Sequence, residues 1–200
     1  MLSRFFAGCR KAAVNFAIPI LLAWLLMDLL HYRLYPSDVR DSPASGNQYG
    51  AVRLRIRLPG THAGIPEPLI VCGRIGSATL VYIRLFSGSR AKMGVEFWGV
   101  KADESETFPL PAMDGVLDIT CYAPAFFPPA DDPYWGELSD GLRRIRRTQY
   151  CIVVNGVVRL RRPVDYSQSP HSPIYVGRNP LGGSLVSSAF TGAILKEFQK

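Results

Sequence analysis

The sequence predicts an all-β domain, built as a two-layered antiparallel sandwich, behind an apolar N-terminal segment. From residue 49 on, short runs rich in Val, Ile, Tyr and Phe alternate with turn residues, and the 200-residue chain contains 18 Gly and 16 Pro. No long helical periodicity follows residue 40. Hydrophobic residues make up 48% of the chain and charged residues 20%, a balance that supports one globular core and excludes a disordered chain.

The first element is an apolar run, residues 12–30, which follows a short segment with three basic residues and no acidic ones. A membrane-spanning helix needs about 20 mainly apolar residues, so this run is just long enough. The positive charge before it predicts a cytoplasmic N-terminus, residues 1–11, and an extracytoplasmic domain, periplasmic or at the cell surface. We therefore expect a single-pass membrane protein, with residues 12–30 as a signal anchor in the lipid bilayer.

Two alternatives for this run stay open. A cleaved secretory signal has an apolar core of about 7–15 residues and a small-residue cleavage site; this run is longer, and the polar sequence HYRLYPSDVR follows it. A helix buried in the domain would carry a polar face, which the run lacks. Residues 31–48 are mostly polar and contain two Pro, three Ser and one Gly, and they are predicted to be a juxtamembrane linker to the domain at 49–200.

The domain begins with a strand of strict two-residue periodicity. In AVRLRIRLP, Val52, Leu54, Ile56 and Leu58 share one face, and Arg53, Arg55 and Arg57 the other. Further strands are predicted in EPLIVCGRI, ATLVYIRLF, KMGVEFWGV, GVLDITCYA, QYCIVVNGVVRLRR, PIYVGRN and FTGAILKEFQ. Asn155-Gly156 predicts a tight hairpin whose two central residues have positive φ. Only DPYWGELSDGLRRI indicates a helical turn or two.

The segment IYVGRNPLGGSLVSSAFTGAI predicts how the domain closes. Gly177 ends a strand, and the pair Gly182-Gly183 permits positive φ in a tight loop. Phe190 and Ile194 are expected to return to the core, with Gly192 between them where a side chain would crowd a neighbour. We expect the last strand to pair beside the first, which removes a free sheet edge. A phosphate-binding loop is not indicated, because no Lys follows the Gly-Gly pair and no helix follows the loop.

Two segments carry a resemblance to a known family. RTQYCIVVNGVVRL resembles a strand, Asn-Gly turn, strand unit, and PIYVGRNPLGGSLVSSAFTGAILKEFQ resembles a strand ending in Gly, a small-residue loop and Phe-x-Gly-x-Ile. Over residues 49–198 the chain thus resembles the laminin G-like, concanavalin A-like lectin fold, a jelly roll of two antiparallel sheets, in versions tethered to bacterial membrane proteins. The resemblance implies a binding module for a glycan or cell-envelope polymer, with Ca²⁺ common at the rim of the sandwich.

Catalysis is not indicated by the residues. Glycan-cleaving enzymes of the resembled fold carry Glu-x-Asp-x-x-Glu, and this sequence has no Glu-x-Asp. The acidic cluster KADESETF, with Glu104 and Glu106, is interpreted as a solvated turn, and Glu96 is the one acid within an apolar strand. The three His residues lie in linker or turn contexts, and no G-x-S-x-G elbow occurs. We therefore expect no enzyme, although glycan cleavage stays a third hypothesis.

The cysteines leave their redox state open. Cys72, Cys121 and Cys151 fall in the predicted outer domain, and no C-x-x-C pair indicates zinc. An exported domain can oxidise Cys121 and Cys151, which lie in strand-like runs that can be neighbours. Free buried thiols fit the sequence equally well.

Aromatic residues give the candidate ligand site, because they stack on the apolar C–H faces of sugar rings. Trp135, in the loop DDPYWG, is the aromatic side chain that we most expect to be exposed. Trp98 alternates with Phe97 on a strand, so one of the two is expected in the core, and AFFPP is interpreted as a packed corner. The candidate ligand-binding residues are Trp135, Tyr134, Trp98, Arg178 and Asn179.

Clusters of charged residues are the candidates for metal and polyanion binding. Asp131 and Asp132, with Asp140, are the candidate Ca²⁺ ligands, but their segment lacks the alternating pattern of a dedicated loop; no other cofactor is expected. Arginines cluster at 143–147 and 159–162 in a chain of net charge +7. They can bind anionic polymers or lipid headgroups, but we favour a solvated face. Nucleic acid is not expected, because the domain is predicted to be exported and lacks aromatic-basic interleaving.

The sequence therefore predicts a membrane-anchored, extracytoplasmic module that binds a glycan or an envelope polymer. The alternative is a structural or protein-interaction domain that packs against another membrane or envelope protein.

Overall fold

The structure is a computed structural model that describes residues 50–60, 64–98, 101–111, 115–164 and 173–199. All of them belong to one compact unit, residues 47–200. The predicted N-terminus, membrane anchor and linker, residues 1–48, lie outside the described residues. Within the described ranges, no helix is long and apolar enough to cross a bilayer.

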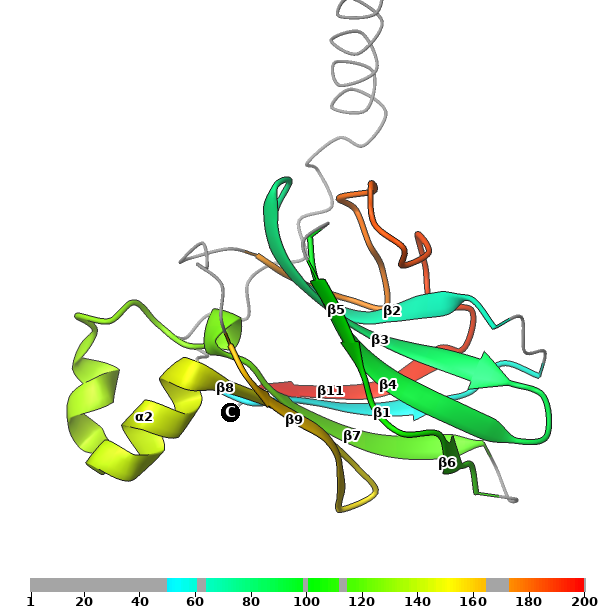
Figure 1. The fold of residues 1–200 in the computed structure, drawn as a ribbon, viewed down its shortest axis with the longest axis horizontal. Coiled ribbons are helices and arrows are strands. Elements are labelled where there is room, and N and C mark those ends of the chain that lie inside the picture. Colours follow the sequence, from blue (N-terminus) through cyan, green and yellow to red (C-terminus); the bar gives the residue numbers. More distant parts are fainter. Residues whose placement is uncertain (1–49, 61–63, 99–100, 112–114, 165–172, 200) are drawn as a thin grey trace, which may run out of the picture. The chain divides into compact units, whose positions relative to one another are not determined.

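Two antiparallel sheets packed face to face form the domain, which confirms the predicted β-sandwich (Figure 1). Sheet A has the order β11-β1-β7-β8-β9, and sheet B has the order β10-β2-β3-β4-β5 with β6 beside β4. The strands of sheet A are β1 (Val52–Arg57), β7 (Val116–Tyr122), β8 (Gln149–Val154), β9 (Val157–Pro163) and β11 (Ala193–Gln199). Those of sheet B are β2 (Pro66–Arg74), β3 (Ser77–Phe86), β4 (Arg90–Phe97), β5 (Lys101–Glu104), β6 (Phe108–Pro109) and β10 (Ile174–Val176).

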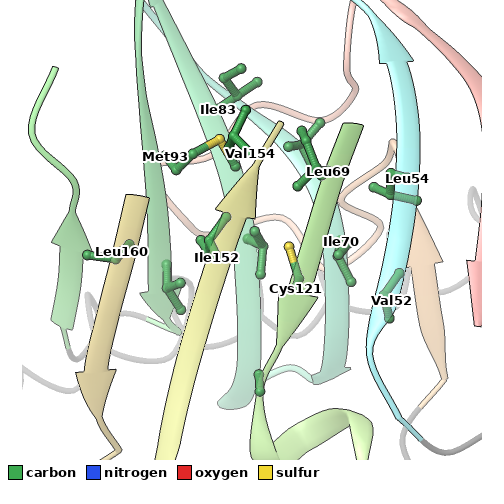
Figure 2. Packing of buried hydrophobic residues seen from close by; sticks show 14 of the residues in the cluster. Val52, Leu54, Leu69, Ile70, Ile83, Met93, Cys121, Ile152, Val154 and Leu160 are labelled. Carbon is green, nitrogen blue, oxygen red and sulfur yellow. The ribbon is translucent and has the colours of Figure 1, made fainter. Parts of the chain in front are cut away.

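One hydrophobic core fills the space between the sheets. Leu54 from β1, Ile152 from β8 and Met93 from β4 all point into it and are at most 2% exposed (Figure 2). In β1 the apolar residues are buried and the arginines between them are exposed, as the two-residue periodicity predicts. Because the whole core is built from residues 52–194, the unit 47–200 has a core of its own.

The Asn155-Gly156 hairpin is confirmed between β8 and β9. Asn155 has φ 50° and Gly156 has φ 80°, which is the left-handed geometry expected of both central residues. The Asn155 side chain also accepts a hydrogen bond from the Asp118 N–H at 2.9 Å, and its own N–H donates to the Asp118 carbonyl at 2.8 Å. The turn is thereby tied to the neighbouring strand β7.

The acidic segment KADESETF is not a solvated turn, and that interpretation is wrong. Residues 101–104 form β5, which pairs with β4. Asp103 accepts a hydrogen bond from the buried Tyr150 hydroxyl of sheet A at 2.6 Å, while the buried Ser105 hydroxyl accepts one from the Met93 N–H at 3.1 Å. Cross-strand partners thus satisfy polar side chains that the sequence pattern assigns to solvent.

Three short helices connect β7 to β8: η1 (Pro124–Phe126), η2 (Pro133–Glu137) and α2 (Asp140–Thr148). The predicted helical turns are confirmed, and α2 extends them to nine residues. Phe126 and Phe127 are 2% and 7% exposed, which confirms AFFPP as a packed corner.

The three cysteines of the domain are free and buried. Cys121 of β7 lies opposite Ile152 of β8, so Cys121 and Cys151 are on adjacent strands but point to opposite faces of sheet A. Burial raises the pKa of Cys72 to about 12, and burial together with the nearby Cys151 raises the pKa of Cys121 well above its ordinary value. Neither of these two thiols is a thiolate nucleophile at neutral pH.

The last strand closes the sandwich beside the first, as predicted. β11 pairs antiparallel with β1, and the register shifts by one residue between Arg55 and Ile56. Gly192 precedes β11 where the chain enters sheet A. A Cβ atom at Gly192 would lie 2.3 Å from the Arg57 carbonyl oxygen and 2.5 Å from Cζ of Phe190. The requirement for glycine that the sequence indicated is confirmed.

Gly192→Ala is expected to destabilise the domain by about 2–3 kcal/mol, because overpacking must move the β1 backbone or the Phe190 ring. Urea unfolding followed by tryptophan fluorescence measures it. Gly136→Ala is the control, since a Cβ there meets nothing within 4 Å. Equal stability of the two variants would show that closure by β11 tolerates a side chain at position 192.

Candidate functional site

The outer face of sheet B, which points away from sheet A, is partly covered by residues 178–191, here called the closing loop. The loop leaves β10 and returns on itself: the Phe190 N–H donates to the Gly177 carbonyl, and the Asn179 N–H donates to the Ser188 carbonyl. Its Val186 packs with Leu80 and Val71 of sheet B in a second, smaller apolar cluster. The closing loop therefore borders the solvent-exposed part of the outer face of sheet B.

Two buried carboxylates fasten the closing loop to sheet B. Glu67 of β2, 7% exposed, accepts hydrogen bonds from the Thr191 N–H at 2.8 Å and from the Thr191 hydroxyl at 2.9 Å. Glu96 of β4, 3% exposed, accepts one from the Leu185 N–H at 3.2 Å. A buried carboxylate is tolerated when it is hydrogen-bonded, and bonds to a charged acceptor are the stronger ones. One acid thus holds the tip of the loop and the other its end.

Asn179 organises the loop from within. It is 5% exposed, its amide group donates to the Ser184 hydroxyl at 3.2 Å and to the Val186 carbonyl at 3.3 Å, and its side-chain oxygen accepts from the Leu181 N–H at 3.2 Å. The side-chain amide and oxygen of Asn179, which were predicted to contact a ligand, are therefore used in hydrogen bonds within the loop. Arg178, beside it, places its guanidinium 5.3 Å from the centre of the Tyr175 ring.

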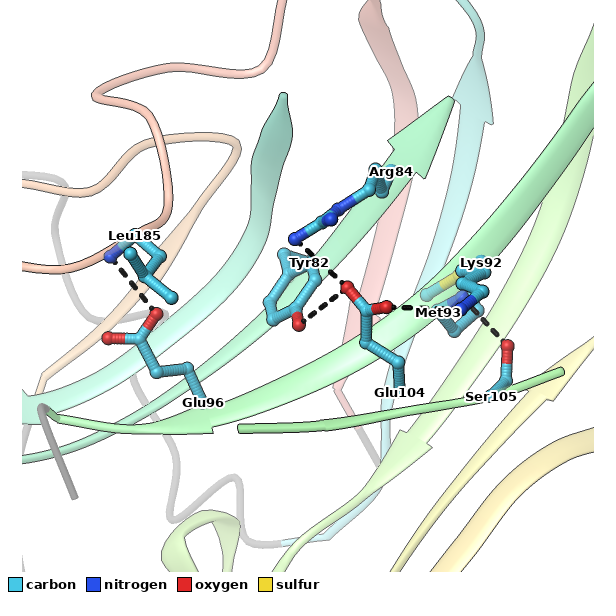
Figure 3. A network of polar contacts seen from close by, with 8 residues as sticks. All are labelled: Tyr82, Arg84, Lys92, Met93, Glu96, Glu104, Ser105 and Leu185. Atoms are coloured by element: carbon cyan, nitrogen blue, oxygen red, sulfur yellow. Dashed lines mark hydrogen bonds and ion pairs between the residues drawn. The ribbon is translucent and has the colours of Figure 1, made fainter. Parts of the chain in front are cut away.

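Beyond the loop, three polar side chains surround Glu104 (Figure 3). Glu104 of β5 accepts a hydrogen bond from the Tyr82 hydroxyl at 3.1 Å. It also forms ion pairs with Arg84 at 3.0 Å and with Lys92 at 3.3 Å. The side chains of the three charged residues are 23–31% exposed and therefore reachable from solvent, whereas Tyr82 is 2% exposed. We call Tyr82, Arg84, Lys92 and Glu104 the polar cluster.

The position of the Tyr82 ring explains the glycine in KMGVEF. A Cβ atom at Gly94 would lie 2.1 Å from Cζ of Tyr82, so the ring lies directly on the bare backbone of β4. Burial first, and then the negative charge of Glu104, raises the pKa of the Tyr82 hydroxyl well above its ordinary value. Tyr82 is therefore a hydrogen-bond donor at every physiological pH.

The sequence-predicted site residues fall into two groups. Trp98, Arg178 and Asn179 belong to the outer face of sheet B, together with the closing loop. Trp98 is half-buried, and a Cβ atom at Gly183 would lie 3.1 Å from its ring, while Phe97 is in the core. The prediction that one of these two aromatic residues is in the core is confirmed. Tyr134 and Trp135 lie elsewhere, beside α2.

The predicted exposure of Trp135 is wrong, because the ring is only 5% exposed. Its indole N–H donates to the Pro129 carbonyl at 2.6 Å, and Arg147 of α2 covers the ring with its guanidinium 4.5 Å from the ring centre. Tyr134 packs edge-on against it at 5.3 Å between ring centres. These contacts use the ring faces that a sugar would need, so Trp135 secures α2 to the domain.

Two of the three candidate Ca²⁺ ligands, Asp132 and Asp140, make local contacts. The Asp132 carboxylate accepts a hydrogen bond from the Tyr134 N–H at 2.8 Å and caps η2. Asp140 forms a 3.6 Å ion pair with Arg143, while Asp131 is exposed. In the part of the chain that the structure describes, no group of three His, Cys, Asp or Glu side chains could hold a metal ion.

Sequence reasoning missed the polar cluster, although a signal for it exists. In ATLVYIRLF the two-residue periodicity places Leu80, Tyr82 and Arg84 on one face, and in KMGVEF it places Lys92 and Glu96 on one face. Both segments look like fully buried strands in the sequence, but their outward-facing residues include polar as well as apolar side chains. Glu67 carried no comparable signal, because its partner Thr191 lies 124 residues away in sequence.

Comparisons of the chain with protein-family models, with curated proteins and with solved structures find no match.

Glu67→Gln is expected to destabilise the domain by about 2 kcal/mol, since a neutral amide replaces a charged acceptor and presents an N–H group to the Thr191 donors. Urea unfolding measures the change. Glu106→Gln, at an exposed position next to β5, is the matched control and is expected to leave stability within about 0.5 kcal/mol. A Glu67→Gln variant as stable as this control contradicts the fastening role.

Proposed function

We propose that the domain is a binding module that recognises a glycan, or another hydroxyl-rich polymer of the cell envelope, on the outer face of sheet B. The observation that carries the proposal is the polar cluster, in which donors and an acceptor are held in place and remain 23–31% exposed at the charged side chains. Sugar hydroxyls both donate and accept hydrogen bonds, so a cluster that offers a carboxylate beside a guanidinium and an ammonium group matches them.

Order in the cluster favours affinity for such a ligand. Tyr82 is fixed by its packing on Gly94, and Glu104 is fixed by three donors. Side chains that are already immobilised lose little entropy when a ligand binds. Trp98, half-buried at the border with the closing loop, supplies the aromatic surface on which a sugar ring can stack.

Binding is favoured over cleavage by the different accessibility of the two acids on this face. Retaining glycosidases place two carboxyl groups about 5–5.5 Å apart on either side of the bond that they cleave. Here Glu96 is 3% exposed and accepts the Leu185 N–H, so of these two acids only Glu104 can meet a polymer. The proposal is accordingly for a protein without enzymatic activity of its own.

The proposal includes the finer fold and the placement that the sequence predicts. It assigns the sandwich to the laminin G-like, concanavalin A-like jelly rolls that the chain resembles, a choice supported by the pairing of β11 with β1 and by the Asn155-Gly156 hairpin. It places residues 12–30 in the membrane and the domain outside the cytoplasm, supported by the apolar run and the basic residues before it.

One observation favours the alternative of a protein-interaction domain. Leu142 and Ile145 of α2 are 47% and 48% exposed, whereas Arg143, Arg146 and Arg147 of the same helix contact the domain. An apolar pair that points to solvent on a helix fastened by arginines is the kind of anchor that protein interfaces use. Co-purification of a protein partner that is lost in Leu142→Ser would support this alternative.

Fragment 47–200 is expected to bind members of a glycan panel, and Glu104→Gln and Lys92→Met are each expected to weaken that binding about tenfold or more, because both side chains are partly exposed. A hydrogen bond with a charged partner is worth about 1.5–3 kcal/mol, which sets this magnitude. Titration calorimetry with the bound glycan gives the affinities.

Asp118→Asn is the control for this experiment. It changes an acid on the outer face of sheet A, 66% exposed at its side chain, and is expected to leave glycan affinity unchanged. The proposal fails if the folded fragment binds no glycan, or if all three variants bind as the unchanged fragment does.

A further inference from the structure

The outer face of sheet A, on the opposite side of the sandwich, is strongly basic. Alternation along β1 places Arg53, Arg55 and Arg57 on this face, and all three are exposed. Lys196 of β11 lies opposite Arg55, and Arg161 of β9 lies opposite Cys151, which extends the same face across the sheet. Five of the 23 Lys and Arg residues of the chain therefore lie on one sheet face.

Acidic residues do little to neutralise the three arginines of β1. Among the described side chains on the same face the one carboxylate is Asp118 of β7, which lies opposite Arg55 and 3.7 Å from its Nε. Both side chains are more than half exposed, so the pair contributes little. Arg53 and Arg57 form no ion pair with any residue that the structure describes; their neighbours on β7 are Thr120 and Val116.

Protection of a sheet edge does not explain these arginines. Basic residues often line edge strands to prevent pairing with another chain. β1, however, lies between β11 and β7, where its hydrogen-bonding groups are already paired. Like charges on alternate residues, about 7 Å apart along the strand, repel one another. A negatively charged partner would remove that repulsion.

We propose that the outer face of sheet A docks on a lipid bilayer that contains anionic headgroups. The five cations are spread over β11, β1 and β9, a width of roughly 19 Å at the usual spacing of strands. Such a two-dimensional array fits a planar anionic surface, whereas a linear polymer follows a single row of charges. The three arginines of β1 are the centre of the array, and contact is electrostatic, without insertion of apolar side chains.

Docking by this face leaves the polar cluster of sheet B pointing away from the bilayer, because the two outer faces are on opposite sides of the sandwich. It requires neither a membrane-spanning segment at residues 12–30 nor a ligand on sheet B. Failure of glycan binding and failure of bilayer docking are therefore separate outcomes, each read from its own variants.

The test uses fragment 47–200, which has its own core, and co-sedimentation with vesicles. We expect binding to vesicles of phosphatidylcholine with about 30% phosphatidylglycerol, little binding to phosphatidylcholine alone, and release as salt screens the charges. In Arg53→Gln/Arg57→Gln the affinity is expected to fall about 30-fold, since each basic residue at an anionic surface contributes about fivefold.

Two matched variants make the result specific. Arg74→Gln/Arg90→Gln removes the same charge from exposed strand ends in sheet B and is expected to bind as the unchanged fragment does. Arg53→Lys/Arg57→Lys keeps the charge and is expected to retain binding, which also controls for any loss of folding in the glutamine variant. Circular dichroism of each variant confirms that it is folded.

Three results would overturn the proposal. One is no difference between the two vesicle types at low salt. Another is equal loss of binding in the sheet A and sheet B glutamine variants, which would reduce the effect to net charge. The third is tight binding of the soluble polyanion dextran sulfate without binding to anionic vesicles, which would make the basic face a polymer site.

Discussion

Hydrogen bonds from the closing loop to two buried carboxylates are the constraint on which the arrangement of this domain depends. Glu67 accepts the Thr191 N–H and hydroxyl, and Glu96 accepts the Leu185 N–H. They fix the tip and the end of the loop, whose Val186 packs in the small apolar cluster on sheet B. Thr191 also directs the chain out of sheet B and into β11, which completes sheet A beside β1. The same buried hydrogen bonds thus support the closing loop, the outer face of sheet B and the closure of the sandwich. Buried polar groups such as these are costly to leave without hydrogen-bond partners.

The two outer faces of the sandwich differ in a way that suits different partners. Sheet B presents a small, ordered cluster in which Glu104 is balanced by Arg84 and Lys92, next to a loop and a half-buried aromatic ring. Sheet A presents a wider basic array in which Asp118 is the one described carboxylate. The first is suited to a neutral, hydroxyl-rich ligand that needs directed hydrogen bonds, and the second to a surface whose charge alone attracts it.

Short sequence patterns predicted the structural features that depend mainly on neighbouring residues. The alternation in β1 and the positive φ at Asn155 depend on residues close in sequence, and each is confirmed. The crowding at Gly192 is confirmed as well, and it combines the nearby Phe190 ring with the carbonyl of the distant Arg57. What the sequence did not indicate depends on distant partners. The Trp135 ring is buried where carbonyl groups of a proline corner and an arginine of α2 contact it. β5 pairs with β4, and its Asp103 is bonded by Tyr150 from the other sheet. The sequence predicted only part of the site on sheet B, since it indicated Trp98 but not Tyr82 or Arg84.

Native-state hydrogen exchange at two backbone amides tests the fastening of the loop most directly. The Leu185 side chain is 73% exposed at the tip of the loop, so its amide would exchange rapidly if it were not bonded to Glu96. We predict that the amides of Leu185 and Thr191 exchange as slowly as those in the centre of β3, through the same cooperative unfolding. Rapid exchange of both amides, with β3 still protected, would show that the carboxylates do not hold the loop.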